Sequence, residues 1–271
     1  MEDMGKVICG DCIEVMAGMP DGCIDLTVTS PPYDGLRSYG GITFGMEEFA
    51  KVAEQLYRVT ADGGVVVWVV ADQTKKGSES GTSFRQALGF MDIGFRLHDT
   101  MIYQKVNPVP NAGRRYQQEF EYMFVLSKGS PKTVNILTEP RRNSCQDRRK
   151  TRIKPFSRNK DGSFSEGKLY EYKEFVPRRN IWSYKVGQHN STMYDPAFGH
   201  PAIFPEALVY DHVMSWSEEG DVVLDPFCGS GTTLIVAKLT GRGYVGIDSV
   251  EEYCELARKR LLEQSELRLD K

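Results

Sequence analysis

The chain has 271 residues, of which 40% are hydrophobic, so it is long enough for one large domain or for one domain with a sizeable insertion. No run of about 18 apolar residues occurs, so no membrane span is expected. Residues 1–6 lack the basic start and apolar core of a signal peptide, so no signal peptide is expected either. The net charge of −3 alone disfavours a polyanionic partner, but residues 101–200 hold 19 basic and 9 acidic residues, a net of +10, and the remainder carries −13.

The first part of the chain alternates short apolar runs with amphipathic stretches. The run 65–70 is continuously apolar, which is typical of a strand that is covered on both faces. Alternation of strands and helices predicts an α/β fold. Strands are expected at 7–9, 24–28, 65–70, 95–104 and 120–126, and helices at 12–19, 46–59 and 83–90.

The six cysteines are scattered. Cys9 and Cys12 have the spacing of half a zinc site, but no second Cys or His pair has matching spacing, so no metal site is expected. Reduced thiols and a cytoplasmic location are the expectation for such a chain.

The tetrapeptide Ser30-Pro31-Pro32-Tyr33 follows the strand 24–28. Two consecutive prolines cannot continue a sheet ladder, so the strand must end there. A strand end that presents a hydroxyl, carbonyl oxygens and an aromatic ring can bind a flat molecule that carries an NH2 group. A plain strand followed by a Pro-Pro turn is the alternative. The glycine-rich residues 34–41 that follow, with Arg37, are suited to a lid.

Residues 139–185 lose the α/β periodicity and are basic, rich in turns and interspersed with aromatics. Arginine with aromatic residues suits phosphate contact combined with stacking. A solvated basic loop is the alternative.

Periodicity returns with a helix at 206–216, and residues 221–248 form a βαβ unit with a glycine-rich turn at 226–231. This is the pattern of an adenosine-cofactor site. Leu234 stands where a dinucleotide motif has its third glycine, and the turn lacks the lysine of a P-loop. Asp225 suits a cationic group, and Asp248 is placed to accept ribose hydroxyls. S-adenosylmethionine carries both a cationic ammonium group and a ribose, so it fits both aspartates. A nucleotide, a nicotinamide cofactor or a purely structural unit stays as the alternative. A helix is expected at 251–262.

Two motifs and their order resemble the beta group of amino-methylating DNA methyltransferases. The segment from Asp225 to Thr232 resembles the cofactor motif of that family, and Ser30 to Tyr33 resembles its catalytic motif, which precedes it. His200 to Pro205 resembles the segment that closes over the cofactor, Gly10-Asp11 an acidic site near the adenine, and Glu119 to Leu126 a late strand. The resemblance covers residues 5–128 and 198–262.

The resemblance implies a fold, a division of the chain into three segments and a set of site residues. The expected fold is the α/β, Rossmann-like S-adenosylmethionine-dependent methyltransferase fold, a mostly parallel sheet flanked by helices, with an inserted basic target-recognition region. Residues 1–128 would form the catalytic half, 129–198 the insert and 199–271 the cofactor half. The implied catalytic residues are Ser30, Pro31, Pro32 and Tyr33; the cofactor residues are Asp11, Phe204, Asp225, Pro226, Phe227, Gly229, Ser230, Gly231, Thr232 and Asp248; the DNA-binding residues are Arg37, Arg141, Arg148, Arg152 and Arg178.

The same resemblance implies a mechanism. The target base is flipped out of duplex DNA and stacks on Tyr33. The Pro31 carbonyl and the Ser30 hydroxyl accept hydrogen bonds from its amino group, and the methyl group moves by direct displacement. Methylation at carbon 5 of cytosine is excluded, because it needs a Pro-Cys dipeptide and this sequence has none.

The resemblance leaves alternatives for the target base and for the partners. Serine at position 30 resembles enzymes that methylate cytosine at N4, whereas aspartate there resembles those for adenine N6, which stays as the alternative. Protein glutamine methylation and a DNA-binding protein without chemistry are further alternatives. Double-stranded DNA is the expected partner; a cognate restriction endonuclease and a homodimer remain open.

Overall fold

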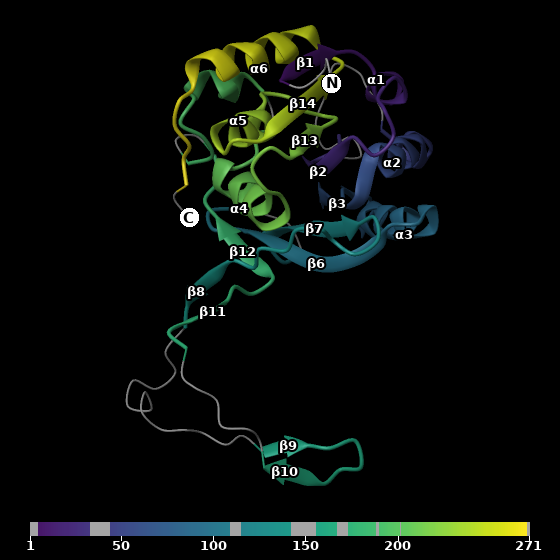
Figure 1. The fold of residues 1–271 in the computed structure, drawn as a ribbon, viewed down its shortest axis with the longest axis vertical. Coiled ribbons are helices and arrows are strands. Elements are labelled where there is room, and N and C mark those ends of the chain that lie inside the picture. Colours follow the sequence, from purple (N-terminus) through teal and green to yellow (C-terminus); the bar gives the residue numbers. More distant parts are fainter. Residues whose placement is uncertain are drawn as a thin grey trace. The chain divides into compact units, whose positions relative to one another are not determined.

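The computed structural model describes residues 5–32, 44–108, 115–141, 156–166, 173–187, 190–200 and 202–269 (Figure 1). The chain divides into two compact units. Unit 1 comprises Met1–Asn135 and Asn180–Lys271, and unit 2 is Ile136–Arg179. Unit 1 contains a large central sheet, whereas unit 2 contains two short antiparallel ladders: β8 (Thr138–Pro140) with β11 (Phe175–Pro177), and β9 (Phe156–Arg158) with β10 (Phe164–Glu166).

The central sheet of unit 1 has eight strands and is mostly parallel. The exception is β7, which runs antiparallel to both of its neighbours, β3 and β6. In spatial order the strands are β1 (Lys6–Cys9), β14 (Gly243–Asp248), β13 (Val222–Asp225), β2 (Ile24–Thr29), β3 (Thr60–Val70), β7 (Phe120–Ser127), β6 (Arg96–Lys105) and β12 (Ile181–Tyr184).

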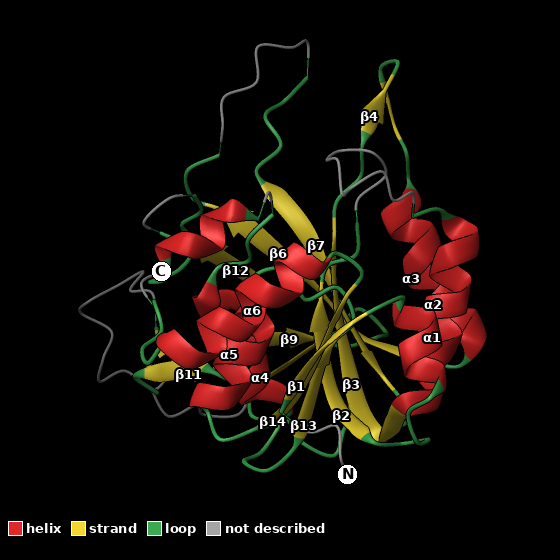
Figure 2. Ribbon diagram, turned by 90° about the horizontal axis from the view of Figure 1, so that it is seen from above, coloured by secondary structure: helices red, strands yellow, loops and turns green. Residues whose placement is uncertain are grey.

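Helices cover both faces of this sheet (Figure 2). One face carries α1 (Cys12–Ala17), α2 (Met46–Val59) and α3 (Thr82–Ile93), and the other carries α4 (Glu206–Trp216), α5 (Thr232–Leu239) and α6 (Glu251–Glu263). Short elements complete the unit: the hairpin β4 (Thr74–Lys75) with β5 (Ser78–Glu79), and the 3-10 helix η2 (Asp195–Gly199). Because both faces of the sheet are covered, the Val65–Val70 part of β3 is buried throughout, as the continuous apolar run predicts.

The core between the sheet and α2–α3 is aromatic. Trp68 on β3 is fully buried and makes edge-to-face contacts with Phe49 and Phe90, with ring centroids 5.9 and 5.1 Å apart. Its indole N–H donates to the side-chain oxygen of Gln86 at 2.9 Å, so the buried polar atom is satisfied. This rigid layer fixes the end of β2, which pairs with β3 along its length.

The strand directions bring particular residues to one edge of the sheet. The parallel strands β1, β14, β13 and β2 all end there, and so do β6 and β12, whereas the antiparallel β7 begins there. Asp225, Asp248 and Ser30 therefore meet at this carboxyl edge, where open α/β sheets place their ligands.

The predicted α/β class, the mostly parallel sheet and every predicted strand and helix are confirmed. One strand of the central sheet was missed, as were the short strands β4, β5 and β8–β11 outside it. β12 lies inside the stretch 139–185, which was predicted as a basic, polyanion-facing segment, yet Trp182 is buried and its ring lies 4.7 Å from that of His212. The compact unit 2, residues 136–179, is correspondingly shorter than the predicted insert 129–198.

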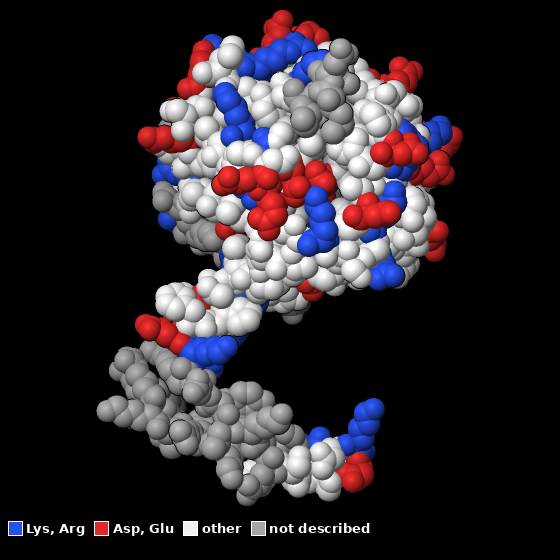
Figure 3. Space-filling view, in the orientation of Figure 1, with Lys and Arg blue, Asp and Glu red and all other residues white. Residues whose placement is uncertain are grey.

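Basic and acidic side chains are interspersed on the face of unit 1 that Figure 3 shows. Among the described residues, no helix has the length and apolar character needed to cross a membrane.

Candidate active site

A cavity of about 720 Å³ opens at the carboxyl edge of the sheet, and unit 1 alone supplies its described lining. It brings together the two motifs that lie almost 200 residues apart in the chain. Of the predicted site residues, those that line it are Asp11, Ser30, Pro32, Phe204, Asp225, Pro226, Phe227, Gly229, Ser230, Thr232 and Asp248.

The remaining predicted site residues lie elsewhere. Pro31 is buried beside the cavity, and Gly231 caps α5. Arg141 and Arg178 belong to unit 2. Tyr33, Arg37, Arg148 and Arg152 lie outside the described residues.

Asp225 is the buried acid at the end of β13. Its Oδ1 accepts hydrogen bonds from the Thr29 hydroxyl at 2.7 Å and from the Phe227 N–H at 3.1 Å. Burial raises the pKa of this carboxyl to about 6, although the hydrogen bonds oppose the rise. A carboxylate that is costly to ionise and that faces a cavity is prepared for a cationic group.

Asp248 holds the glycine turn in place. Its Oδ2 accepts from the Gly229 N–H at 2.9 Å, and its Oδ1 accepts from the Val250 N–H at 3.0 Å. Each carboxylate oxygen has a second lone pair, so Asp248 can still accept a hydroxyl from a ligand. Asp11 is similar: it caps α1 by accepting from the Ile13 N–H at 2.8 Å and lines the same cavity.

The glycine turn depends on the absence of a side chain at Gly229. This residue has a φ of +48°, and a Cβ at this position would lie 2.8 Å from Nε2 of His200. The His200 ring also packs edge-on against Tyr253, at 4.4 Å between centroids. His200 thus forms part of the cavity wall. The sequence did not reveal its contacts with Gly229 and Tyr253, because these residues are distant from it in the chain.

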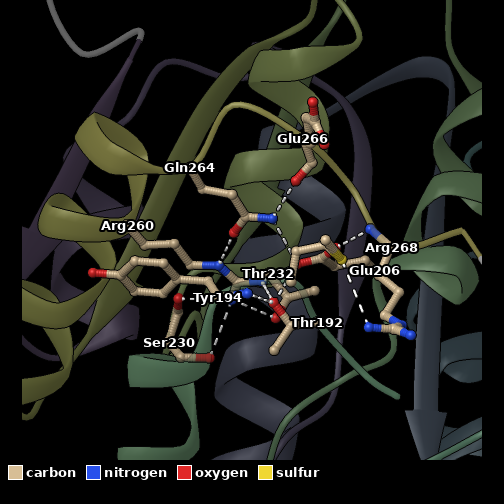
Figure 4. A network of polar contacts seen from close by, with 10 residues as sticks. Thr192, Tyr194, Glu206, Ser230, Thr232, Arg260, Gln264, Glu266 and Arg268 are labelled. Carbon is tan, nitrogen blue, oxygen red and sulfur yellow. Dashed lines mark hydrogen bonds and ion pairs between the residues drawn. The ribbon is translucent and has the colours of Figure 1, made fainter. Parts of the chain in front are cut away.

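A second structure that the sequence missed is a buried ion pair behind the turn (Figure 4). Arg260 of α6 and Glu206 of α4 are both fully buried and are joined at 2.7 Å. Arg260 also donates to the Ser230 carbonyl at 3.0 Å and to the Thr232 hydroxyl at 2.9 Å. The pair therefore ties the turn to two helices. A charged residue on the inner face of an amphipathic helix was the available signal.

A third missed feature lies at the opposite end of the cavity. Lys105 and Glu121, on neighbouring strands β6 and β7, form an ion pair of 2.6 Å and both line the cavity. Tyr103 lies beside them, and burial, followed by the nearby Glu121 charge, raises the pKa of its hydroxyl so that it remains a neutral phenol. Charged residues at strand ends were visible in the sequence, but their pairing depends on the order of the strands.

The chemistry of the cavity fits S-adenosyl-L-methionine. Asp225 offers a buried acceptor for an ammonium, Asp248 and Asp11 offer acceptors for hydroxyl and amino groups, and the bare backbone of Gly229 allows close approach. Among the described residues, no cluster of His, Cys, Asp or Glu is suited to hold a metal ion.

Comparison with known proteins supports this interpretation. The model of the N6/N4 methyltransferase family, described as DNA methylase, matches residues 24–259. The orphan methyltransferase M.BamHII of Bacillus amyloliquefaciens is 54% identical over 242 residues, which cover 89% of this chain and 89% of that protein. The type II methyltransferase M.SmaI of Serratia marcescens is 28% identical and covers 95% of this chain and 90% of its own.

Solved structures share the fold. The crystal structure of a DNA modification methylase from Thermus thermophilus, complexed with S-adenosyl-L-methionine, has a TM-score of 0.62 and 25% identity, and covers 96% of this chain and 95% of that chain. PvuII DNA methyltransferase (cytosine-N4-specific) has a TM-score of 0.70 at 19% identity, with 97% and 92% covered.

Proposed function

The chain belongs to the N6/N4 DNA methylase family, and from that premise we propose that it transfers a methyl group from S-adenosyl-L-methionine to the exocyclic N4 of cytosine in duplex DNA. The observation that carries the proposal is the shared cavity, which is lined both by the glycine turn and by Ser30 and Pro32 at the end of β2. Membership in a DNA methylase family disfavours the protein-amide alternative.

The residues at the glycine-turn end bind the cofactor. S-adenosyl-L-methionine supplies an electrophilic methyl group when bound. Asp225 binds its ammonium, Asp248 and Asp11 accept hydrogen bonds from its hydroxyl and amino groups, and the turn from Pro226 to Thr232 surrounds it. Phe204 reaches the cavity from the segment before α4.

The strand end after β2 orients the substrate amine. The target base leaves the duplex at a cost of a few kcal/mol and stacks on Tyr33. The Pro31 carbonyl and the Ser30 hydroxyl accept the two amino hydrogens, which directs the nitrogen lone pair toward the methyl group. Positioning supplies much of the rate, and these acceptors stabilise the positive charge that develops on nitrogen.

Serine at position 30 favours cytosine N4 over adenine N6, because of the family resemblance. We assign DNA contacts to the basic residues Arg37, Arg141, Arg148, Arg152 and Arg178, and target recognition to the inserted basic region. Duplex DNA is the partner of this activity.

The test is the identity of the product. Unmethylated plasmid DNA is incubated with the full chain and labelled S-adenosyl-L-methionine, digested to nucleosides and analysed by mass spectrometry. N4-methylcytosine is expected. N6-methyladenine in its place would retain the cofactor site and the mechanism but refute the role given to Ser30, and no methylated nucleoside would refute the proposal.

A further inference from the structure

The Lys105–Glu121 pair lines the cavity, and the cofactor assignment above gives it no role. The Lys105 ammonium lies 2.6 Å from Glu121 Oε1, and the two side chains are only 29% and 11% exposed. Antiparallel pairing of β6 with β7 fixes both, because the Lys105 N–H donates to the Glu119 carbonyl at 2.7 Å. A largely buried ion pair contributes little to stability after desolvation, so a pair that faces a cavity is a candidate for function.

The order of the strands places this pair on the substrate side of Ser30. Asp225 and Asp248 are the last residues of β13 and β14, and Asp11 follows β1; these three strands lie on one side of β2. Glu121 and Lys105 stand on β7 and β6, on the other side. The strand β7 is two positions from β2, about 10 Å at the usual spacing. A base that presents its amine at Ser30, with the cofactor on the turn side, extends toward this pair.

The donor and acceptor pattern of the two candidate bases then decides what the pair can recognise. An ammonium is a donor only. Beyond its amino group, cytosine presents the acceptor N3 and then the carbonyl oxygen O2. Adenine presents the acceptor N1 and then a C–H group, which accepts nothing.

We propose that Lys105, oriented by Glu121, donates a hydrogen bond to O2 of the flipped cytosine and so selects cytosine over adenine. The inference rests on the proposed function and deepens it. It gives a reason for the choice of cytosine that is independent of the resemblance at Ser30. With adenine bound, the Lys105 ammonium would keep its contact with Glu121 but would lose contact with water and gain no acceptor in exchange, and polar sites discriminate through such lost hydrogen bonds.

The experiment compares Lys105→Met and Glu121→Gln with the wild-type chain. Methylation of plasmid DNA with labelled S-adenosyl-L-methionine gives kcat/KM for DNA, calorimetry gives the Kd for the cofactor, and nucleoside analysis gives the product. Lys51→Met is the matched control, because Lys51 forms an exposed pair with Glu47 on α2 at 3.4 Å and does not line the cavity.

Lys105→Met is expected to lower kcat/KM for DNA by about 10- to 100-fold, with an unchanged cofactor Kd. Glu121→Gln is expected to have a smaller effect in the same direction, and Lys51→Met none. An N4-methylcytosine product with a wild-type kcat/KM in Lys105→Met would overturn this inference and leave the proposed function intact. If Lys105→Met weakened cofactor binding by as much as it lowered kcat/KM for DNA, the role of Lys105 would be structural, and this inference would be overturned as well. N6-methyladenine from the wild-type chain would overturn both.

Discussion

At the residue scale, Asp225 links pH to both stability and cofactor binding. Burial raises the pKa of its carboxyl from 3.8 to about 6 in the folded protein. Between these values the folded state holds a proton that the unfolded state has released, so this group makes the ligand-free protein less stable as pH rises from about 4 to 6. A shift of about two pKa units corresponds to about 3 kcal/mol.

We predict that Asp225→Asn stabilises the ligand-free protein at pH 7.5 by about 1–3 kcal/mol and lowers its affinity for S-adenosyl-L-methionine. The amide oxygen can still accept from Thr29 and Phe227, but it carries no charge for an ammonium. Urea unfolding at pH 7.5 and 4.5, with calorimetric titration, measures both effects, and the gain in stability should shrink at pH 4.5. A variant that is less stable than wild type at pH 7.5 would contradict the role of burial.

Below pH 6 the wild-type protein should also lose cofactor affinity, since the cationic group of the cofactor binds the ionised carboxyl. This follows from the same group and needs no further residue.

At the scale of elements, the βαβ unit packs its helix closely against the sheet by means of a glycine on the strand and not on the helix. A dinucleotide motif uses its third glycine to let the helix approach the sheet. This chain has Leu234 there, and the missing space is supplied by Gly246 on β14, where a Cβ would lie 2.3 Å from Cδ1 of Leu234. Leu234 is fully buried, so it cannot turn aside.

Gly246→Ala should therefore destabilise the protein by about 1–3 kcal/mol through overpacking. Adding Leu234→Ala should cost less in this background than in wild type, because the truncated side chain no longer collides with the new methyl group. Thermal or urea unfolding of the wild type, the two single variants and the double variant gives the coupling energy between positions 246 and 234. Gly199→Ala serves as the control, since its Cβ would have no neighbour within 4 Å. Strict additivity would refute direct contact.

The sequence predicted these elements because their periodicities are long and consistent. The strand β12 was missed because its four residues stand at a sheet edge and among arginines, so that only pairing with β6 defines it. Likewise, Asp225 and Asp248 were found through a local motif, whereas the Lys105–Glu121 pair and the contact of His200 with Gly229 depend on strand order and chain crossings that no local pattern encodes.

At the scale of the whole molecule, charge is separated between the two units. Residues 136–179 hold 13 basic and 6 acidic residues, a net of +7, and the rest of the chain carries −10. A polyanion is attracted to such a segment, and its affinity falls as salt rises because condensed counterions are released.

The described part of unit 2 offers two arginines that test this. Arg141 and Arg178 flank the β8–β11 ladder, where their backbone N–H groups donate to the carbonyls of Glu174 and Leu137, both at 2.8 Å. The ladder is held by backbone hydrogen bonds, which the substitutions retain, although replacing Arg141 also removes the bond from its Nε to the Lys173 carbonyl at 3.0 Å.

We predict that the double variant Arg141→Gln/Arg178→Gln binds duplex DNA more weakly and with a shallower dependence on salt. Each phosphate contact contributes about 0.9 to the slope of log K against log salt, so a decrease of about 1–2 is expected if one or both contact phosphate. Fluorescence anisotropy from 50 to 300 mM salt measures the slope. Arg258→Gln is the control, because Arg258 is an exposed arginine of α6 paired with Glu251 at 2.7 Å in the acidic unit. An unchanged slope in the double variant would mean that the basic charge of unit 2 does not neutralise DNA at these positions.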